Sequence, residues 1–414
     1  MAAFIAALIV ALGQAGMAAP VAEAAPSVAR DARLGGDSQR TRFVADLSRE
    51  VPFRLFTLPD PYRVIVDLPD VKFQFPSGRG SKGRGLVSTF RYGLIAEGRA
   101  RIVIETIAPV LVDKAFVLPA KNAQPARLVI DLARTDRKTF LATRQTLGSA
   151  APVSEAGKGG GAPPPVRRAR RRGEKPVVVI DPGHGGIDPG ATSRSGLKEK
   201  HVVFAFSRAL RDRLNATGRY KAVLTRKIDV YVPLRERVAI ARRLNGELFI
   251  SIHADSIPGR YSKKISGATV YTLSEKASDE EARALAAKEN HSDVIAGVEL
   301  PDVEDEVTGI LIDLAMRETK NLSINFADII IDSLRGKTPL MKKAHRFAGF
   351  RVLKAPDVPS VLLELGYMSN PNDVRKMTSK AWRNRVSVAI VKSVDRFFAE
   401  KRQGFRLNEA GRRR

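Results

Sequence analysis

The stretch VVVIDPGHGG, residues 177–186, decides the fold of the second half of this 414-residue chain. Four apolar residues in a row predict a strand that is buried on both faces, as in a parallel sheet. The proline and glycines that follow predict a tight turn at the end of that strand. One of the five histidines, His184, therefore lies on a turn at the edge of a predicted sheet.

Further apolar runs of the same kind alternate with helical stretches along the rest of the chain. They lie at residues 221–225, 248–252, 267–273 and 360–365. Continuous apolar strands separated by helices indicate an α/β fold, with a mostly parallel sheet covered by helices on both faces. We expect this domain to occupy residues 177–400 and to bind its ligand at the carboxyl ends of the strands.

The N-terminal half repeats one short pattern, an arginine followed by an apolar run and a carboxylate. It occurs as RFVADL at 42–47, RVIVDL at 63–68, RIVIET at 101–106 and RLVIDL at 127–132. Each copy has the length and residue types of a strand, so together they predict a small all-β sandwich over residues 30–135. This basic region contains no histidine, and we expect it to bind rather than to catalyse.

Two further segments lack a core-forming pattern. Residues 136–176 are rich in glycine, proline and arginine and predict a linker, whose arginines either touch a polyanion or lie in solvent. Residues 1–25 join an apolar run to small residues and predict a cleaved signal peptide. Retention as an anchor is the alternative, because the usual positive charge at the start is missing. With no other candidate span, we expect no stable membrane insertion after cleavage.

Composition narrows the chemistry. Lysine and arginine number 70 against 44 aspartates and glutamates, a net charge of +26. This charge predicts attraction to a polyanion: a nucleic acid, an anionic membrane or an acidic wall polymer. The alternative is a basic surface that only keeps the protein in solution, and composition does not choose among these. The absence of cysteine excludes disulfides and thiolate ligands, so a transition-metal site must use histidine, aspartate and glutamate.

Three side chains with metal-binding or acid–base chemistry lie at predicted strand ends. His184 follows the first strand, His253 follows the run at 248–252, and Glu364 interrupts the run at 360–365. A carboxylate among valines and leucines is costly to bury without a compensating partner. If the three strands are neighbours, two imidazoles and a carboxylate converge at one edge of the sheet. Asp181 and Asp188 flank His184; we assign both to turn formation, with orientation of the His184 ring as the alternative.

Glu199 is predicted to join this group from a helix. The core-facing stripe of that helix recurs at spacings of three and four: Val203, Phe206, Leu210 and Leu214. Extended back by four residues, the stripe reaches Glu199. His201 lies two positions further on and points away, so we exclude it from the site.

His184, Glu199 and His253 form a ligand set known from catalytic Zn²⁺ sites, with one coordination position left for water. The ion acidifies this water and polarises a carbonyl, while a second carboxylate accepts the proton. We assign that second role to Glu364. For a single histidine the ordinary alternative is a turn residue without function. A phosphate-binding loop fails because no Lys-Ser or Lys-Thr pair follows the glycines.

Four motifs in a fixed order carry a specific resemblance. They are VVVIDPGHGGIDPGA, LKEKHVV, FISIHADS and SVLLELGYMSN. They resemble the zinc-dependent N-acetylmuramoyl-L-alanine amidases that split bacterial cell walls during daughter-cell separation, and the match covers about residues 175–400. The region of repeated strands resembles the AMIN domain that often precedes this catalytic domain.

The resemblance implies that His184, Glu199 and His253 bind Zn²⁺ and that Glu364 is the catalytic glutamate. It implies hydrolysis of the amide bond between N-acetylmuramic acid and L-alanine of the stem peptide. It also implies a periplasmic location, with peptidoglycan and not nucleic acid as the partner. Two alternatives stay open: a non-catalytic wall-binding division scaffold, and a zinc peptidase that cuts within the stem peptide.

An insertion at about residues 275–320 is not needed by a minimal sheet-and-helix domain. Ser278 and Glu281 have capping-box spacing before the predicted helix DEEARALAAKEN, and a second helix is predicted within PDVEDEVTGILIDLAMRET. Amidases that resemble this chain and carry such an insertion are thought to be inhibited until a LytM-type activator displaces it. We predict Glu304 as the inhibitory ligand, with Glu306 as the alternative. The competing explanation is an acidic N-terminus that favours the helix dipole.

Overall fold

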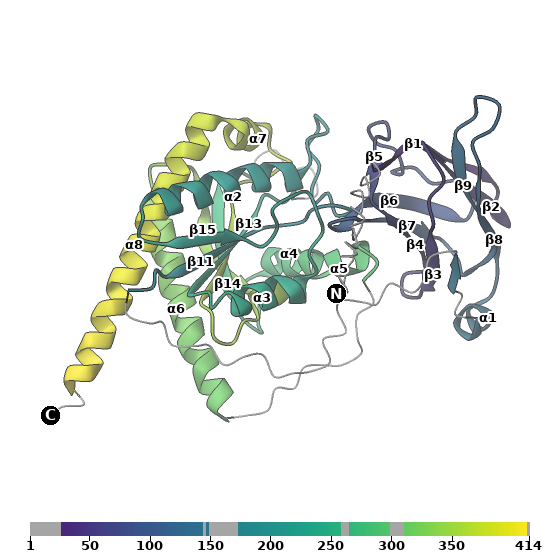
Figure 1. Ribbon diagram of the computed structural model, residues 1–414. Helices are drawn as coiled ribbons and strands as arrows, with labels where there is room; N and C mark the ends of the chain where they lie inside the picture. The colour runs from purple at the N-terminus through teal and green to yellow at the C-terminus, as the bar shows by residue number, and fades with distance from the viewer. Residues whose placement is uncertain (1–25, 144–145, 149–172, 258–264, 299–309, 412–414) are drawn as a thin grey trace, which may run out of the picture.

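The computed structural model describes residues 26–143, 146–148, 173–257, 265–298 and 310–411. Figure 1 shows a β-sandwich in purple and blue beside a larger unit, in teal to yellow, in which helices surround a sheet. The predicted fold class, an α/β unit preceded by an all-β sandwich, is confirmed. The expected signal peptide and most of the expected linker lie outside the described residues.

The sandwich consists of two five-stranded sheets. The first has the order β5-β1-β2-β9-β8, and the second, called the second sheet below, has the order β10-β3-β4-β7-β6. The strands are β1 Ser27–Gly36, β2 Arg40–Leu47, β3 Arg54–Leu58, β4 Arg63–Pro69, β5 Val71–Phe73, β6 Val87–Ala96, β7 Arg99–Thr106, β8 Val110–Leu118, β9 Ala126–Arg134 and β10 Thr146–Gly148. A short helix, α1 (Arg137–Ala142), follows β9.

The four repeated sequence patterns form inner strands of the two sheets. β2 pairs with β9 in the first sheet, and β4 pairs with β7 in the second, both antiparallel. Alternate residues of β4 enter the shared core, as Val64 and Val66 do. Because strand side chains alternate, Ile65 of β4 and Val103 of β7 lie on the outer face of the second sheet.

The second unit is built on one six-stranded sheet of order β12-β11-β13-β16-β14-β15. Its strands are β11 Val177–Pro182, β12 Lys221–Leu224, β13 Leu248–His253, β14 Ala268–Leu273, β15 Leu340–Ala348 and β16 Ser360–Glu364. The first four in spatial order run parallel, whereas β14 is antiparallel to β16. The sequence pattern does not reveal β15, because this edge strand carries Lys342, Lys343 and Arg346 among its apolar residues.

Helices cover both faces of this sheet. They are α2 Glu199–Ala216, α3 Leu234–Arg243, α4 Glu280–Asn290, α5 Ser292–Ile295, α6 Ile310–Leu334, α7 Pro371–Thr378 and α8 Lys380–Gly411, with a 3₁₀ turn, η1, at Arg351–Leu353. Val178 and Ile180 of β11 pack on the face covered by α2, α6 and α8, and Val179 packs on the face covered by α3 and α4. Burial on both faces explains the unbroken apolar run of β11. None of the described helices is long and apolar enough to cross a membrane.

The insertion differs from its prediction in two details. Asp279, not Ser278, caps α4, because its side chain accepts a hydrogen bond from the amide of Ala282. The second predicted helix and the helix after it form one continuous helix, α6, since no glycine or proline separates them. Glu304 and Glu306 lie outside the described residues.

The core of the α/β unit generates a stability prediction. Phe206 of α2 is fully buried, with its ring 6.0 Å from that of Trp382 on α8. We expect Phe206→Ala to lower the free energy of unfolding by about 3–5 kcal/mol, measured by denaturant titration, because it leaves a cavity. Phe347→Ala is the control: Phe347 is 39% exposed on β15, so its loss should change stability by about 0.5 kcal/mol or less. Equal losses would contradict the assignment of Phe206 to the core.

Candidate active site

Three neighbouring strands bring the predicted site residues to one edge of the sheet. β13 pairs in parallel with β11 on one side and with β16 on the other. His253 lies directly opposite Glu364 in this register. The turn after β11 is tied to β13 by a hydrogen bond of 3.0 Å from the amide of Gly183 to the carbonyl of Ile252. The expected adjacency of the three strands is confirmed.

The side chains of His184, Glu199 and His253 form a buried cluster. One ligand atom from each lies within 4.8 Å of the other two. Glu199 Oε1 is 3.1 Å from His184 Nε2 and 3.5 Å from His253 Nδ1. Glu199 is the first residue of α2, and the amides of Ala191 and Ala254 each donate a 2.8 Å hydrogen bond to its carboxylate. The helix and the loops thus fix the direction of this side chain.

The cluster has the properties of a cation site. His184 Nε2 and His253 Nδ1 are buried without a hydrogen-bond partner, which is costly unless a further group lies between them. Burial opposes ionisation of Glu199, but the two histidines outweigh burial and hold the pKa of Glu199 well below its ordinary value. An ionised carboxylate facing two imidazole nitrogens suits a transition metal.

The turn that carries His184 has a demanding backbone conformation. His184 has a φ of +58°, in the left-handed region that few residues other than glycine adopt. Arg237, buried in α3, donates hydrogen bonds to the His184 carbonyl at 3.0 Å and to the Asp181 carboxylate at 2.9 Å. At Gly190 only glycine fits, since a Cβ there would lie 2.6 Å from the His184 ring and 2.7 Å from Glu199 Oε2.

Asp188 orients the His184 ring in addition to forming the turn. Its Oδ1 accepts a hydrogen bond from the amide of Gly190 at 3.0 Å, and its Oδ2 lies 2.8 Å from His184 Nδ1. A proton on Nδ1 leaves Nε2 free to bind a metal. Asp188 thus has both of the roles considered for it, turn formation and orientation of His184. Asp181 has neither, since it lies buried in β11 and pairs with Arg237.

Glu364 is fully buried at the end of β16. Its Oε2 accepts a hydrogen bond of 3.0 Å from the amide of Asp255, whereas its Oε1 has no partner. Burial, followed by the charges of Glu199 and Asp255, raises the pKa of Glu364 well above its ordinary value. A carboxyl group with a raised pKa and a free oxygen is suited to proton transfer near neutral pH.

Sequence reasoning missed Glu289, which lies over the cluster from α4. Its Oε2 is 3.2 Å from His253 Nδ1 and 3.6 Å from His184 Nε2, and burial raises its pKa. The preceding residue, Lys288, forms an ion pair with the buried carboxylate of Asp255. The helical spacing could have identified Glu289, because it ends the buried stripe of α4: Ala282, Leu285, Ala286 and Glu289.

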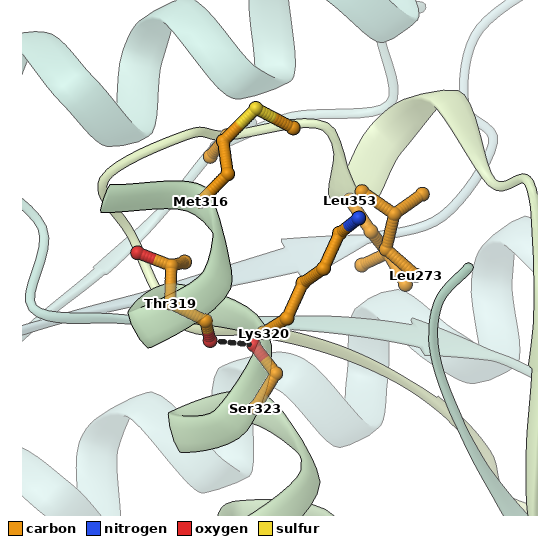
Figure 2. A pocket seen from close by; sticks show the side chains of 7 residues that line it. Leu273, Met316, Thr319, Lys320, Ser323 and Leu353 are labelled. Carbon is orange, nitrogen blue, oxygen red and sulfur yellow. Dashed lines mark hydrogen bonds between the residues drawn. The ribbon is translucent and has the colours of Figure 1, made fainter. Parts of the chain in front are cut away.

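Other parts of the described structure hold no comparable cluster of imidazoles and carboxylates. The excluded His201 is exposed and lies 3.8 Å from Asp229. His345 on β15 contacts Thr272 at 3.1 Å. A separate pocket lies beside α6 (Figure 2), and its lining is apolar or neutral apart from Lys320.

A buried ligand set for a metal, beside a buried glutamate of raised pKa, defines the class of a metal-dependent hydrolase. Comparison with family models is specific: residues 178–396 match the model described as N-acetylmuramoyl-L-alanine amidase, and residues 31–132 match the AMIN domain. The chain belongs to the N-acetylmuramoyl-L-alanine amidase family. It is a peptidoglycan hydrolase that cleaves the amide bond between N-acetylmuramic acid and L-alanine, as its motifs predicted.

The similarity to curated relatives extends over both units. The chain is 31% identical over 383 residues to N-acetylmuramoyl-L-alanine amidase AmiC of Escherichia coli O6:H1, with 89% of each chain covered. It is 30% identical over 375 residues to AmiC of Neisseria meningitidis serogroup B, with 88% of this chain and 89% of the relative covered. Among solved structures, amidase AmiC2 of Nostoc punctiforme is 28% identical with a TM-score of 0.38, covering 55% of this chain and 98% of that chain.

The contact between Asp188 and His184 generates a prediction for metal binding. In Asp188→Asn, the oxygen that faces Gly190 can stay in place, so the amide group faces His184 Nδ1 and favours protonation of Nε2. We expect divalent-metal affinity, measured by chelator competition, to fall about 10- to 100-fold. Asp212→Asn, at an exposed position on α2, is the charge-matched control. An unchanged affinity in Asp188→Asn would show that the ring needs no such partner.

Proposed function

We propose that His184, Glu199 and His253 hold a Zn²⁺ ion and that Glu364 is the catalytic carboxylate of this amidase. The observation that carries the proposal is the convergence of two buried, unpartnered imidazole nitrogens on Glu199 Oε1. Zn²⁺ commonly binds such a set, and the chain contains no thiolate that would compete. When bound, Zn²⁺ would polarise the substrate carbonyl and lower the pKa of the attacking water.

Glu364 would carry the proton of the reaction. Its Oε1 is free to accept a proton from the attacking water, while the amide of Asp255 fixes Oε2. The water oxygen bonds to the lactyl carbonyl carbon, the carbon–nitrogen bond breaks, and the leaving amine of L-alanine takes the proton from Glu364. The products are a glycan strand with free lactyl carboxylates and a stem peptide with a free amino terminus.

We propose further that the insertion inhibits the resting enzyme through Glu289; Glu304, which the sequence predicts for this role, lies outside the described residues. Glu289 Oε2 lies within 3.6 Å of both imidazole nitrogens. There it would act as a further ligand to the metal and keep the carbonyl group of the substrate away from it. His184 and His253 are only 6% and 4% exposed beneath it. Lys288 adds a second contact to the same edge, through Asp255. A LytM-type activator would then act by displacing α4.

We infer that the enzyme acts in the periplasm during daughter-cell separation. Support comes from the similarity to AmiC proteins over both units and from the net charge of +26, which favours an acidic wall polymer as partner. In this proposal a signal peptide at residues 1–25 directs export and the AMIN domain at 30–135 targets the wall. A linker at 136–176 connects it to the catalytic domain at 177–400, with its insertion at about 275–320.

Two substitutions, each in a Glu289→Ala background, separate the proposed roles. Glu364→Gln should keep bound metal and lose at least about 100-fold in hydrolysis of purified sacculi, because the proton acceptor is gone. His184→Ala should lose both metal and activity. Metal analysis and release of soluble fragments provide the two readouts. Full activity in Glu364→Gln would refute its catalytic role.

The products themselves decide between the proposed reaction and its alternatives. Mass spectrometry of digested sacculi should show stem peptides that begin at L-alanine. Cleavage within the peptide would instead identify a zinc peptidase. If neither the Glu289→Ala form nor a form lacking residues 278–316 releases any product, the chain is a non-catalytic scaffold.

The proposed inhibitory role of Glu289 is tested by basal activity. Glu289→Ala should raise hydrolysis of sacculi on the order of tenfold, which corresponds to the loss of about 1.4 kcal/mol from the closed position of α4. Glu280→Ala, at an exposed position of the same helix, is the matched control and should change nothing. A form that lacks residues 278–316 gives the upper limit of basal activity, because it lacks α4 altogether. Equal basal activity of wild type and deletion would refute the inhibition.

A further inference from the structure

We propose that the AMIN domain is part of the inhibitory device: the outer face of its second sheet holds α5 and thereby keeps α4 and Glu289 over the active site. The inference rests on the proposed inhibitory role of Glu289. It assigns a second task to a domain that the sequence indicated only for binding. Figure 1 shows α5 at the boundary between the sandwich and the α/β unit.

The first support is a buried apolar contact between the two units. Ile65 of β4 and Val103 of β7 point away from the sandwich core, yet both are fully buried. They form one cluster with Ala296, just after α5, and with Ile187 and Tyr231 of the catalytic domain. The outer face of the second sheet is therefore a docking surface and not a solvated face.

The second support is a set of directed hydrogen bonds from two arginines of the AMIN domain. Arg63, 5% exposed, donates to the carbonyl of Val294 at 2.6 Å. Arg101 donates to the carbonyls of Ala296 and Gly297 at 3.2 and 2.8 Å. These carbonyls lie at the end of α5, where carbonyls lack the usual helical partners. The Val294 carbonyl also accepts from the amide of Gly297, so Arg63 adds a second bond there, whereas Arg101 binds carbonyls beyond the last turn.

The third support is the rigid connection between α5 and α4. His291 is the one residue between the two helices; its amide donates to the carbonyl of Ala287, and its carbonyl accepts from the amide of Ile295. Asp293 of α5 also binds the Tyr231 hydroxyl at 2.7 Å on the catalytic side. Displacement of α4 must therefore pull α5 away from the catalytic domain and from the AMIN domain.

The AMIN domain also touches the turn that presents His184. The amide of Tyr231 donates to the carbonyl of Leu94 on β6 at 3.0 Å. A Cβ on Gly186, which has a φ of +54°, would collide with that same carbonyl. The AMIN domain thus contacts both α5, which continues from α4, and the turn that carries His184.

These contacts make undocking of the AMIN domain and opening of α4 energetically coupled. A partner that binds the second sheet only when it is undocked would favour the open state, by an amount set by its differential affinity. The same coupling requires that release of α4 weakens docking of the AMIN domain.

The experiment compares full-length Arg63→Ala and Ile65→Ala with wild type. Ile65 lies outside the sandwich core, so its truncation leaves that core intact. We expect each variant to raise amide hydrogen exchange in residues 280–297 and basal hydrolysis of sacculi by about fivefold, as the loss of one net contact of ordinary strength predicts. Arg42→Ala is the control, since Arg42 pairs with Asp131 on the first sheet, away from α5. It should change neither quantity.

Exchange in β2 and β9 reports whether the AMIN domain remains folded in each variant. Unchanged exchange in 280–297 in both folded variants would overturn the inference. A second result would also overturn the inference: faster exchange in 280–297 without a gain in activity, while Glu289→Ala does raise activity. Docking of the AMIN domain would then not control the position of α4. If Glu289→Ala also fails to raise activity while exchange in 280–297 increases, the inhibitory role of Glu289 fails and docking of α5 on the AMIN domain stands.

Discussion

The parallel pairing of β13 with β11 and β16 is the constraint on which the site depends. Parallel strands in register end at the same edge of the sheet, so the residues that follow them share one small area. In this chain that area receives His253, Glu364 and the turn with His184. Glu199 reaches the same area because it is the first residue of α2, where backbone amides fix its carboxylate.

This arrangement brings several acidic side chains together in the buried site, where they are shielded from solvent. Glu199, Glu289 and Glu364 are all buried, and within the described residues none of them pairs with a lysine or arginine. Such groups are costly unless a proton or a cation compensates them, which is the reason that burial and like charges raise the pKa of Glu364. Without a cation, the Glu289 carboxylate on α4 would be repelled by the neighbouring carboxylates. With a divalent cation bound between them, the same position would be favourable. The chemistry of the site and the position of the insertion are therefore linked by electrostatics.

The sequence predicted those features that break a local pattern. His184 interrupts a glycine turn, Glu364 interrupts an apolar strand, and Glu199 begins an apolar stripe, so each was visible without the structure. Glu289 was harder to recognise, because only its spacing in the buried stripe of α4 marks it and a carboxylate at the end of an amphipathic helix resembles a surface residue. β15 was hidden for a related reason, since an edge strand has fewer neighbours and needs no continuous apolar run. The hydrogen bond from Arg63 to Val294 of α5 joins residues 231 positions apart, a pairing that no local pattern encodes.

The runs RVIVDL and RIVIET each place one apolar residue, Ile65 and Val103, between charged residues on the outer face of the second sheet. An independent sandwich needs no apolar residue there. An AMIN domain separated from its catalytic domain would expose Leu58, Ile65 and Val103 together, a patch of the kind that drives self-association. Solubility of the isolated domain is thus limited by the same residues that bind α5. An AMIN domain exchanged between amidases would then dock correctly only where the matching surface of α5 is exchanged with it.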